Sequence, residues 1–248
     1  MLTTFFMLVV QVAGLPAPPR DTIRVGTMFR RDRLEPRMSI QRLYNVRNGE
    51  RTSAGNLVRT RVPDGSRWLF ISVSYAPKGG AESWDTLAVD GQTLAPRWHR
   101  SHAAHDSASV EYLGTSVRGW SRLHGLPRRV INTTLPSRAF PASMLEDLVG
   151  LVSLSRSYSA HVELYDMWND STESVDVRVT GTEQVPHNGQ LVTAWVVDKL
   201  YDRGIRQMWI ARGDGLLLRT HDRLPQMPAV DGSWKEMTET GLPDPAPR

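Results

Sequence analysis

Apolar and polar side chains alternate with a period of two along much of the chain. The clearest example is the segment 67–75, where Ser72 separates Ile71 from Val73. The same alternation recurs at residues 109–112, 161–165 and 175–180. A period of two predicts strands, and an apolar face opposite a polar face is typical of an antiparallel sheet with one face in water.

Short turn sequences separate these segments. Asn-Gly or Asp-Gly pairs and one Gly-Asp-Gly triplet occur at 48–49, 64–65, 90–91, 188–189 and 213–215. Such pairs supply the positive φ angles that tight hairpins need. The chain is therefore expected to form consecutive hairpins.

Residues 191–197 are apolar on both faces, which predicts a central strand covered on both sides. Residues 208–210 have the same character, and the turn at 213–215 leads into a third apolar run. We expect a three-stranded meander over residues 191–221.

One segment has helical rather than strand periodicity. Apolar residues recur at helical spacing from Met144 to Val152, after Pro141. Ser143 and Glu146 have the spacing of a capping box, in which each side chain bonds the backbone N–H of the other residue. A helix this apolar must lie against a sheet.

The first 19 residues have the pattern of a secretory signal peptide. An apolar run from Leu2 to Val12 is followed by small residues and prolines, and it is too short to span a membrane well. The alternative is a buried first strand or helix. We expect the mature protein to begin near Arg20 and to be periplasmic or secreted, without a stable membrane span.

The remaining chain suggests one domain and a tail. Residues 20–224 are predicted to form a single antiparallel β domain. Residues 225–248 contain five prolines and no clean period, so a surface tail is expected there.

Composition excludes several kinds of chemistry. The 248 residues include no Cys, which removes disulfides, thiolate metal sites and cysteine nucleophiles. Thirty basic residues against 26 acidic ones give a net charge of only +4. The basic residues are scattered apart from a cluster at Arg30, Arg31 and Arg33, so a solvated surface is expected rather than a nucleic-acid site.

The order of these elements resembles a known family. Residues 85–96 predict a strand, a turn and a strand opening on Leu94-Ala95-Pro96, and residues 110–119 predict the next hairpin. The helix follows, and then strands over 204–220. From Ser39 to His221 this order resembles an exported bacterial family of unknown function whose members look similar to the periplasmic lipoprotein carriers (LolA/LolB-like). The chain differs from those carriers in having one convincing helix rather than several.

The resemblance implies a mainly β fold, a strongly curved antiparallel sheet or open half-barrel with one helix packed on its concave face. It brings no functional residues with it. Such a fold can enclose an apolar cavity, so a bound acyl chain or similar apolar ligand is the leading hypothesis. The alternative is that the same side chains fill a core. The candidate lining residues are Trp68, Phe70, Tyr112, Trp120, Leu148, Leu151, Trp195 and Trp209.

His99, His102 and His105 are weak metal candidates. Their spacing of three suits one face of a helix, but Pro96 and the alternating neighbours predict strand and loop. On a strand, His99 and His102 point to opposite faces. We therefore expect no metal site and no cofactor.

Catalytic motifs are equally sparse. The sequence lacks Gly-x-Ser-x-Gly, His-Glu-x-x-His and a phosphate-binding Gly-rich loop. His161 and Glu163 share a strand face and are expected to form an exposed polar pair. Acidic residues around Asn169 lack EF-hand spacing, so a plain hairpin tip is predicted there.

These observations favour an exported, monomeric, non-enzymatic protein that binds an apolar ligand or a lipid-bearing envelope partner. A structural or protein-interaction module with a solid core is the first alternative. An uncharacterised hydrolase is the second.

Overall fold

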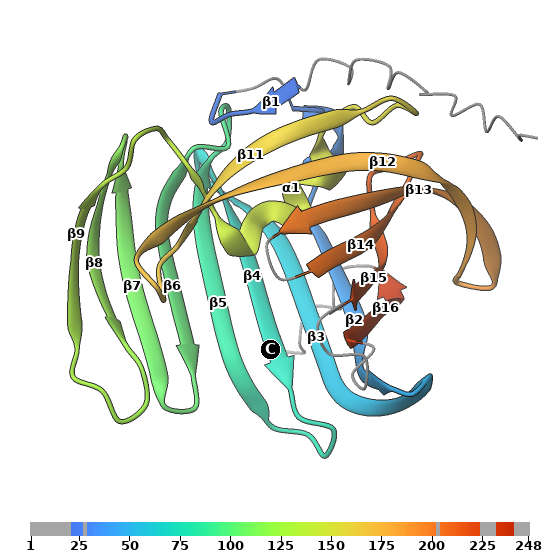
Figure 1. The fold of residues 1–248 in the computed structure, drawn as a ribbon, viewed down its shortest axis with the longest axis horizontal. Coiled ribbons are helices and arrows are strands. Elements are labelled where there is room, and N and C mark those ends of the chain that lie inside the picture. Colours follow the sequence, from blue (N-terminus) through green and yellow to red (C-terminus); the bar gives the residue numbers. More distant parts are fainter. Residues whose placement is uncertain (1–20, 27–28, 202–203, 224–231, 241–248) are drawn as a thin grey trace, which may run out of the picture.

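The computed structural model describes residues 21–26, 29–201, 204–223 and 232–240 (Figure 1). The predicted signal peptide, residues 1–19, lies outside the described residues. Within them, no helix is both long and apolar enough to cross a membrane.

Strands dominate the described chain, and the helical elements are short. These are two 3₁₀ turns, η1 (Arg31–Arg33) and η2 (Ala142–Met144), and the helix α1 (Leu145–Leu151). The strands are β1 (Asp21–Ile23), β2 (Arg37–Arg47), β3 (Glu50–Asp64), β4 (Arg67–Tyr75), β5 (Ala81–Asp90), β6 (Pro96–Ala103), β7 (Asp106–Leu113), β8 (Ser116–Arg122), β9 (Arg129–Thr134), β10 (Phe140–Pro141), β11 (Ser159–Asp166), β12 (Ser171–His187), β13 (Gln190–Tyr201), β14 (Gly204–Ala211), β15 (Leu217–Arg223) and β16 (Gly232–Thr240).

All of these strands belong to one sheet, and all but β10 follow the order β1-β11-β12-β13-β14-β15-β16-β2-β3-β4-β5-β6-β7-β8-β9. Neighbours are antiparallel except β1 and β10, which both pair in parallel with β11. The sheet curves strongly without closing into a barrel, and α1 lies between β11–β12 and β3–β5 (Figure 1). The predicted fold class, a curved antiparallel sheet with one packed helix, is confirmed.

Two of the predicted hairpin turns have the expected positive φ angles. Asn48 and Gly49 both have positive φ angles, 52° and 78°, and join β2 to β3. Asn188 and Gly189 do the same between β12 and β13, with 47° and 74°. The predicted meander over 191–221 is confirmed as β13, β14 and β15.

Curvature comes from irregular pairing. The register shifts within the pairs β2–β3, β4–β5, β5–β6, β12–β13, β14–β15 and β16–β2. Bulges of this kind bend a strand and increase its twist. Gly55, beside the β2–β3 shift, has a φ of 113°, and a Cβ there would lie 2.0 Å from the carbonyl oxygen of Tyr75.

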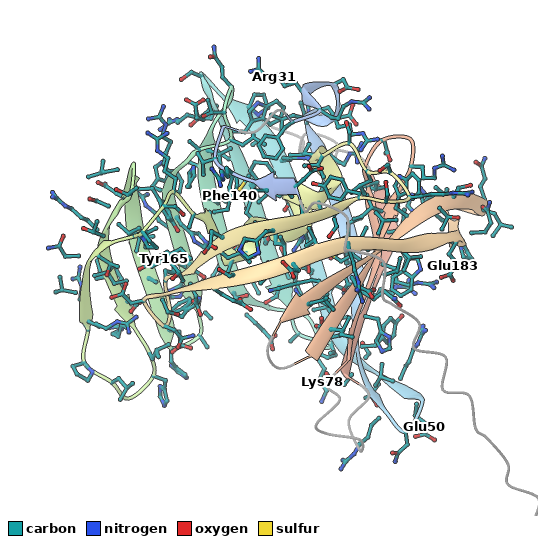
Figure 2. The ribbon with its side chains drawn as sticks, turned by 45° about the horizontal axis from the view of Figure 1, so that its top comes forward. Arg31, Glu50, Lys78, Phe140, Tyr165 and Glu183 are labelled. Atoms are coloured by element: carbon teal, nitrogen blue, oxygen red, sulfur yellow. The ribbon has the colours of Figure 1, made fainter. Side chains whose placement is uncertain are left out.

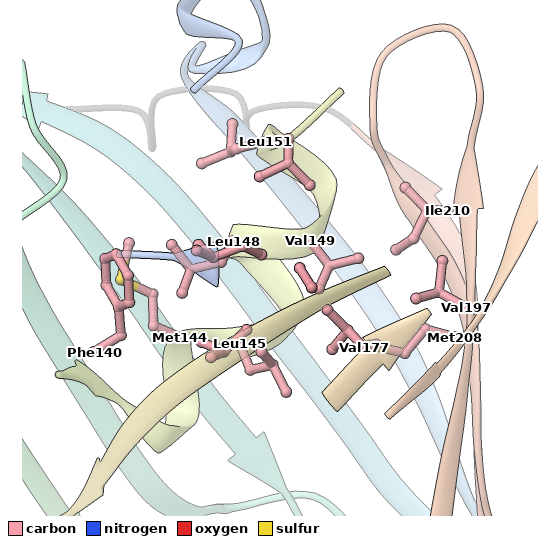
Figure 3. Close-up of a cluster of buried hydrophobic side chains, with 14 of the residues drawn as sticks. Phe140, Met144, Leu145, Leu148, Val149, Leu151, Val177, Val197, Met208 and Ile210 are labelled. Atoms are coloured by element: carbon pink, nitrogen blue, oxygen red, sulfur yellow. The ribbon is translucent and has the colours of Figure 1, made fainter. Parts of the chain in front are cut away.

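The main core surrounds α1. Leu148 and Val149 are completely buried and pack with apolar side chains of β11 to β14 (Figure 3). A seven-residue helix has little stability by itself, so this packing must hold it in place.

The predicted capping box is wrong. The helix begins at Leu145 after a 3₁₀ turn, and no side chain caps its first residues. Ser143 lies in that turn, and the Glu146 carboxylate pairs with Arg59 and Arg206 instead. Two guanidinium groups are stronger partners for a buried carboxylate than one backbone N–H.

The predicted C-terminal tail also needs correction. Residues 232–240 form β16, which pairs with β15 on one side and β2 on the other. Pro228 and Pro243 flank this stretch, and no proline lies inside it. A central strand cannot hold proline, so the absence of proline from residues 232–240 was the sequence feature that could have predicted this strand.

Side chains join β9 to the β11–β12 turn. Arg129 donates hydrogen bonds to the backbone oxygens of Met167, Trp168 and Asn169, at 3.3, 2.7 and 3.3 Å. A second core lies beneath this contact and includes Tyr165, at the opposite end of the β12 ribbon from Glu183 (Figure 2). The predicted hairpin tip around Asn169 is confirmed.

Candidate functional site

The concave side of the sheet has an apolar part and a polar part. Around α1 it is filled by the main core. Beside the helix, the inner faces of β2 to β5 carry polar residues, among them Ser39, Gln41, Arg59, Ser72 and Asp85. A charge-lined space adjoins the helix, beside the region where the sequence suggested an apolar cavity.

An ion-pair network centres on Glu146, which is 4% exposed. Its carboxylate contacts Arg59 Nη2 at 2.5 Å and Arg206 Nη1 at 2.9 Å. Arg206 also pairs with Asp222, and Arg59 lies 3.5 Å from Asp147. Burial lowers the pKa of Arg59, but the carboxylates of Glu146 and Asp147 outweigh it and raise that pKa overall. The network holds the first turn of α1 against β3 and β14.

Two cavities flank Glu146. The smaller, which we term the inner cavity, has a volume of about 50 Å³. Its walls include Arg37, Gln41, Arg61, Ser72, Asp147 and Leu217. The larger, which we term the mouth pocket, has about 270 Å³. Its walls include Leu57, Ser83, Asp85, Ser143, Lys199 and Arg206.

Two walls of the mouth pocket, Asp85 and Ser143, contact the same histidine, His99, which lies behind them. His99 Nε2 lies 2.6 Å from Asp85 Oδ1 and 3.5 Å from Ser143 Oγ. A serine–histidine–aspartate relay needs the acid on one ring nitrogen and the serine on the other. Here both contacts fall on Nε2, which carries either one proton or one lone pair. The row is therefore a hydrogen-bonded support around the buried His99 ring rather than a proton relay.

A third space, which we term the apolar groove, has a volume of about 610 Å³. Its apolar walls are Pro36, Val192, Ala211, Leu216 and Leu218. Its polar walls include Arg37, His187 and Asp214, and Arg37 pairs with Asp214 at 3.1 Å. Arg37 and Leu216 also line the inner cavity, so the two spaces adjoin.

The eight predicted lining residues do not share one space. Phe70, Leu148, Leu151 and Trp195 belong to the main core, with Trp68 packed against it. Tyr112 lies in the second core. Trp209 belongs to a third cluster with Leu216 and Leu218. Trp120 lies under the Arg128 guanidinium, whose carbon is 4.1 Å from the ring centre.

The three candidate metal ligands diverge. His99 is buried against Asp85, while the His102 ring lies 5.5 Å from Trp84. The His105 ring lies 4.6 Å from His124. Across the described ranges, no group of three or more His, Cys, Asp or Glu side chains is arranged to hold a metal ion.

The predicted polar pair on β11 is confirmed. His161 Nε2 lies 3.0 Å from Glu163, and its Nδ1 lies 3.0 Å from Asp176 on β12. The hydrogen bond that the protonated His161 ring donates to the Asp176 carboxylate is the largest cause of a raised pKa at His161. These side chains form a half-exposed surface cluster.

The sequence did not single out Arg37, Gln41 and Arg61. On β2, Arg37, Ser39 and Gln41 alternate with Met38 and Ile40. This pattern ordinarily predicts that the polar side chains face the solvent. In the structure Ser39 and Gln41 are buried, and Met38 and Ile40 keep partial exposure. Alternation identifies a strand without saying which face is internal.

The fold and cavities define a class, the open β half-barrels with a helix in the concave side. Within that class the chain belongs to the DUF3108 family, a family of proteins of unknown function, which matches residues 43–227. This confirms the resemblance inferred from the order of elements. No curated protein sequence matches the chain.

Comparison with solved structures gives two matches, of which one shares the fold. One is a beta-barrel-like protein of domain of unknown function DUF1849 from Brucella abortus. It is 11% identical, covers 85% of this chain and 99% of its own, and has a TM-score of 0.53. The other is a putative outer membrane lipoprotein-sorting protein domain from Vibrio parahaemolyticus. It is 10% identical, with coverages of 86% and 89% and a TM-score of only 0.27, so the fold comparison rests on the first.

Proposed function

We propose that this chain is a non-catalytic binding protein of the cell envelope that holds the apolar part of a ligand in the apolar groove. The observation that carries the proposal is the groove itself, about 610 Å³ with five apolar wall residues. Ligand sites in proteins commonly measure about 300–1,000 Å³ and have mostly apolar walls. The groove has room for an acyl chain or a group of similar size.

The groove replaces the site expected beneath the helix. Leu148 and Leu151 are 0% and 1% exposed, so they fill the core around α1. The spaces beside α1 have charged walls. An apolar chain there would displace water from the charged groups without replacing its hydrogen bonds, which is unfavourable.

The non-catalytic part rests on the row of Ser143, His99 and Asp85. Since both of its contacts use one ring nitrogen, the row provides no general base for the serine. The envelope location is supported by the apolar run at residues 2–12 and the small residues after it. Fractionation of cells that express the full chain, with recovery in the osmotic-shock fluid, would test that location.

The binding test begins with the native mass spectrum of the chain after export to a bacterial periplasm and purification without detergent. We expect added mass that matches a lipid and disappears after organic extraction. The extracted protein is then titrated with 1-dodecanol, which has a long apolar chain and no charge. A bare chain that also fails to bind 1-dodecanol would contradict the proposal.

Two neighbouring residues offer a matched pair of variants. Val192 lines the groove, whereas Leu191, on the other face of β13, is 69% exposed. Val192→Glu places a carboxylate against the apolar chain and is expected to weaken 1-dodecanol binding at least tenfold. Leu191→Glu adds the same charge outside and should leave binding unchanged. Equal effects of both variants would place the ligand elsewhere.

A further inference from the structure

Gln41, on the wall of the inner cavity, has a buried side-chain amide without hydrogen-bond partners. Its side chain is 0% exposed, and neither the amide nitrogen nor the amide oxygen has a hydrogen-bond partner among the protein groups. A buried polar group left without a partner costs about 1–3 kcal/mol. The amide therefore requires an occupant of the cavity that both accepts and donates hydrogen bonds.

Arg61, which is partly buried, adds available hydrogen-bond donors at the same place. Among the described residues its guanidinium makes no hydrogen bond and no ion pair, and its carbon lies 5.8 Å from the ring centre of Phe70. Burial lowers the pKa of Arg61, and the negative charge of Asp147 is the largest influence that raises it. A guanidinium offers five N–H donors and stays charged, so this one carries a positive charge with unused donors.

Two other arginines of the cavity wall add further donors. Arg37 Nη1 and Arg59 Nε are also buried without hydrogen-bond partners. The nearby carboxylates are already engaged, since Glu146 pairs with Arg59 and Arg206. Three arginines and two carboxylates line the cavity, an excess of one positive charge.

We propose that the inner cavity binds a single oxyanion group, a carboxylate or a phosphate, held by Arg61 and by the amide nitrogen of Gln41. Guanidinium groups bind both oxyanions through paired, charge-assisted hydrogen bonds. A hydrogen phosphate also has an O–H that can donate to the amide oxygen of Gln41, which a carboxylate lacks. Phosphate is therefore expected to bind the more tightly of the two.

The size of the cavity limits the occupant to a small group. One water needs about 10–15 Å³ of such space, so about 50 Å³ holds a group of three to five heavy atoms. That is enough for a headgroup and not for an acyl chain.

The anion has two possible sources, which share this chemistry. It can be a free ion, or the headgroup of a ligand whose chain lies in the apolar groove, because Arg37 and Leu216 line both spaces. The second case rests on the proposed function, and the first does not.

The test measures the melting temperature and the binding heat of the full chain with inorganic phosphate, acetate, dodecyl phosphate and dodecanoate at constant ionic strength. Chloride is the reference anion. We expect phosphate and acetate to raise the melting temperature above the chloride value. Tighter binding of the dodecyl compounds would assign the headgroup source, and equal affinity the free ion.

Arg61→Gln should weaken phosphate binding at least tenfold. Arg42→Gln is the matched control, because Arg42 is an exposed residue of β2 and loses the same charge outside the cavity. Gln41→Glu keeps the side-chain size and places a carboxylate beside Arg61. It should raise the melting temperature without added anion and abolish the phosphate response.

Three results would overturn the oxyanion site. The first is a melting temperature that phosphate and acetate raise no further than chloride does. The second is an unchanged phosphate affinity in Arg61→Gln, and the third is an equal loss of phosphate affinity in Arg42→Gln. If 1-dodecanol still binds in any of those cases, the proposed function stands while the anion site fails. If phosphate binds and 1-dodecanol does not, the anion site stands while the proposed function fails.

Discussion

At the scale of the residue, Arg33 joins segments that lie far apart in the sequence. Its Nη1 donates to the backbone oxygens of Gly150 and Val152 at the end of α1, each at 3.2 Å. Its Nη2 donates to those of Arg212 and Gly213, at 3.1 and 3.3 Å. The last carbonyl groups of a helix lack helical partners, and a cation beside them is favourable. One arginine therefore fixes the end of the helix to the β14–β15 turn.

Replacing Arg33 tests this role. Arg33→Ala removes four hydrogen bonds and leaves buried carbonyl groups unpaired, so we expect a loss of about 2–4 kcal/mol in the free energy of unfolding. Arg31→Ala serves as the control, because exposed Arg31 makes a single bond to the Gln92 backbone. Its effect should stay below about 0.5 kcal/mol. Urea unfolding of both variants decides the matter, and similar losses would refute the role of Arg33.

The cluster of His161, Glu163 and Asp176 gives a prediction about pH. Its hydrogen bonds raise the pKa of His161 in the folded state. The protonated ring therefore stabilises the fold fully below the unfolded pKa of about 6.5, and the contribution is lost as the pH rises through the higher folded pKa. The ring is 37% exposed, so screening by water keeps the effect small. Melting temperatures between pH 5 and 9 should fall less steeply for His161→Gln than for the parent, and identical slopes would exclude the linkage.

At the scale of the element, α1 depends on a close backbone approach. A Cβ at Gly150 would lie 2.4 Å from the carbonyl oxygen of Gly215, too short for any real contact. Gly150→Ala is favourable by helix propensity, by about 1 kcal/mol. The clash must push α1 away from the β14–β15 turn, so we expect a net loss of about 1–3 kcal/mol.

The control for that substitution is Gly181→Ala. Gly181 lies at the register shift of β12, and a Cβ there meets no atom within 4 Å. Thermal unfolding should show a lower melting temperature for the Gly150 variant and little change for the Gly181 variant. A stabilised Gly150→Ala would mean that the turn moves freely and does not position the helix.

Strands and turns could be predicted from the sequence more reliably than the environment of their side chains. Period-two alternation and Asn-Gly turns depend on local backbone geometry, so the hairpins and the meander were predictable. The inward side of β2 was not, because Gln41 faces a polar cavity that only the assembled sheet creates. The capping box failed for a similar reason, since Arg59 and Arg206, distant in sequence, take the Glu146 carboxylate. Long-range ionic partners have no local signature.

At the scale of the whole molecule, β16 connects the two halves of the sheet. It lies between β15, the end of the run from β11, and β2, the start of the run to β9. A chain that ends at residue 231 would leave two unpaired edges in the middle of the sheet, and such edges promote aggregation. We expect it to lose more than about 4 kcal/mol of stability, a size reserved for the loss of a major structural feature.

Hydrogen exchange followed by mass spectrometry would locate that loss. Backbone amides of β2 and β15 should lose protection first in the shortened chain, because their ladder bonds to β16 are gone. A synthetic peptide of residues 232–240 should restore protection there, whereas a scrambled peptide of the same composition should not. If the shortened chain keeps full protection in both strands, then β2 and β15 are held by the rest of the fold. In that case the inner cavity, whose walls include Arg37 and Gln41 of β2, would not depend on the C-terminal strand.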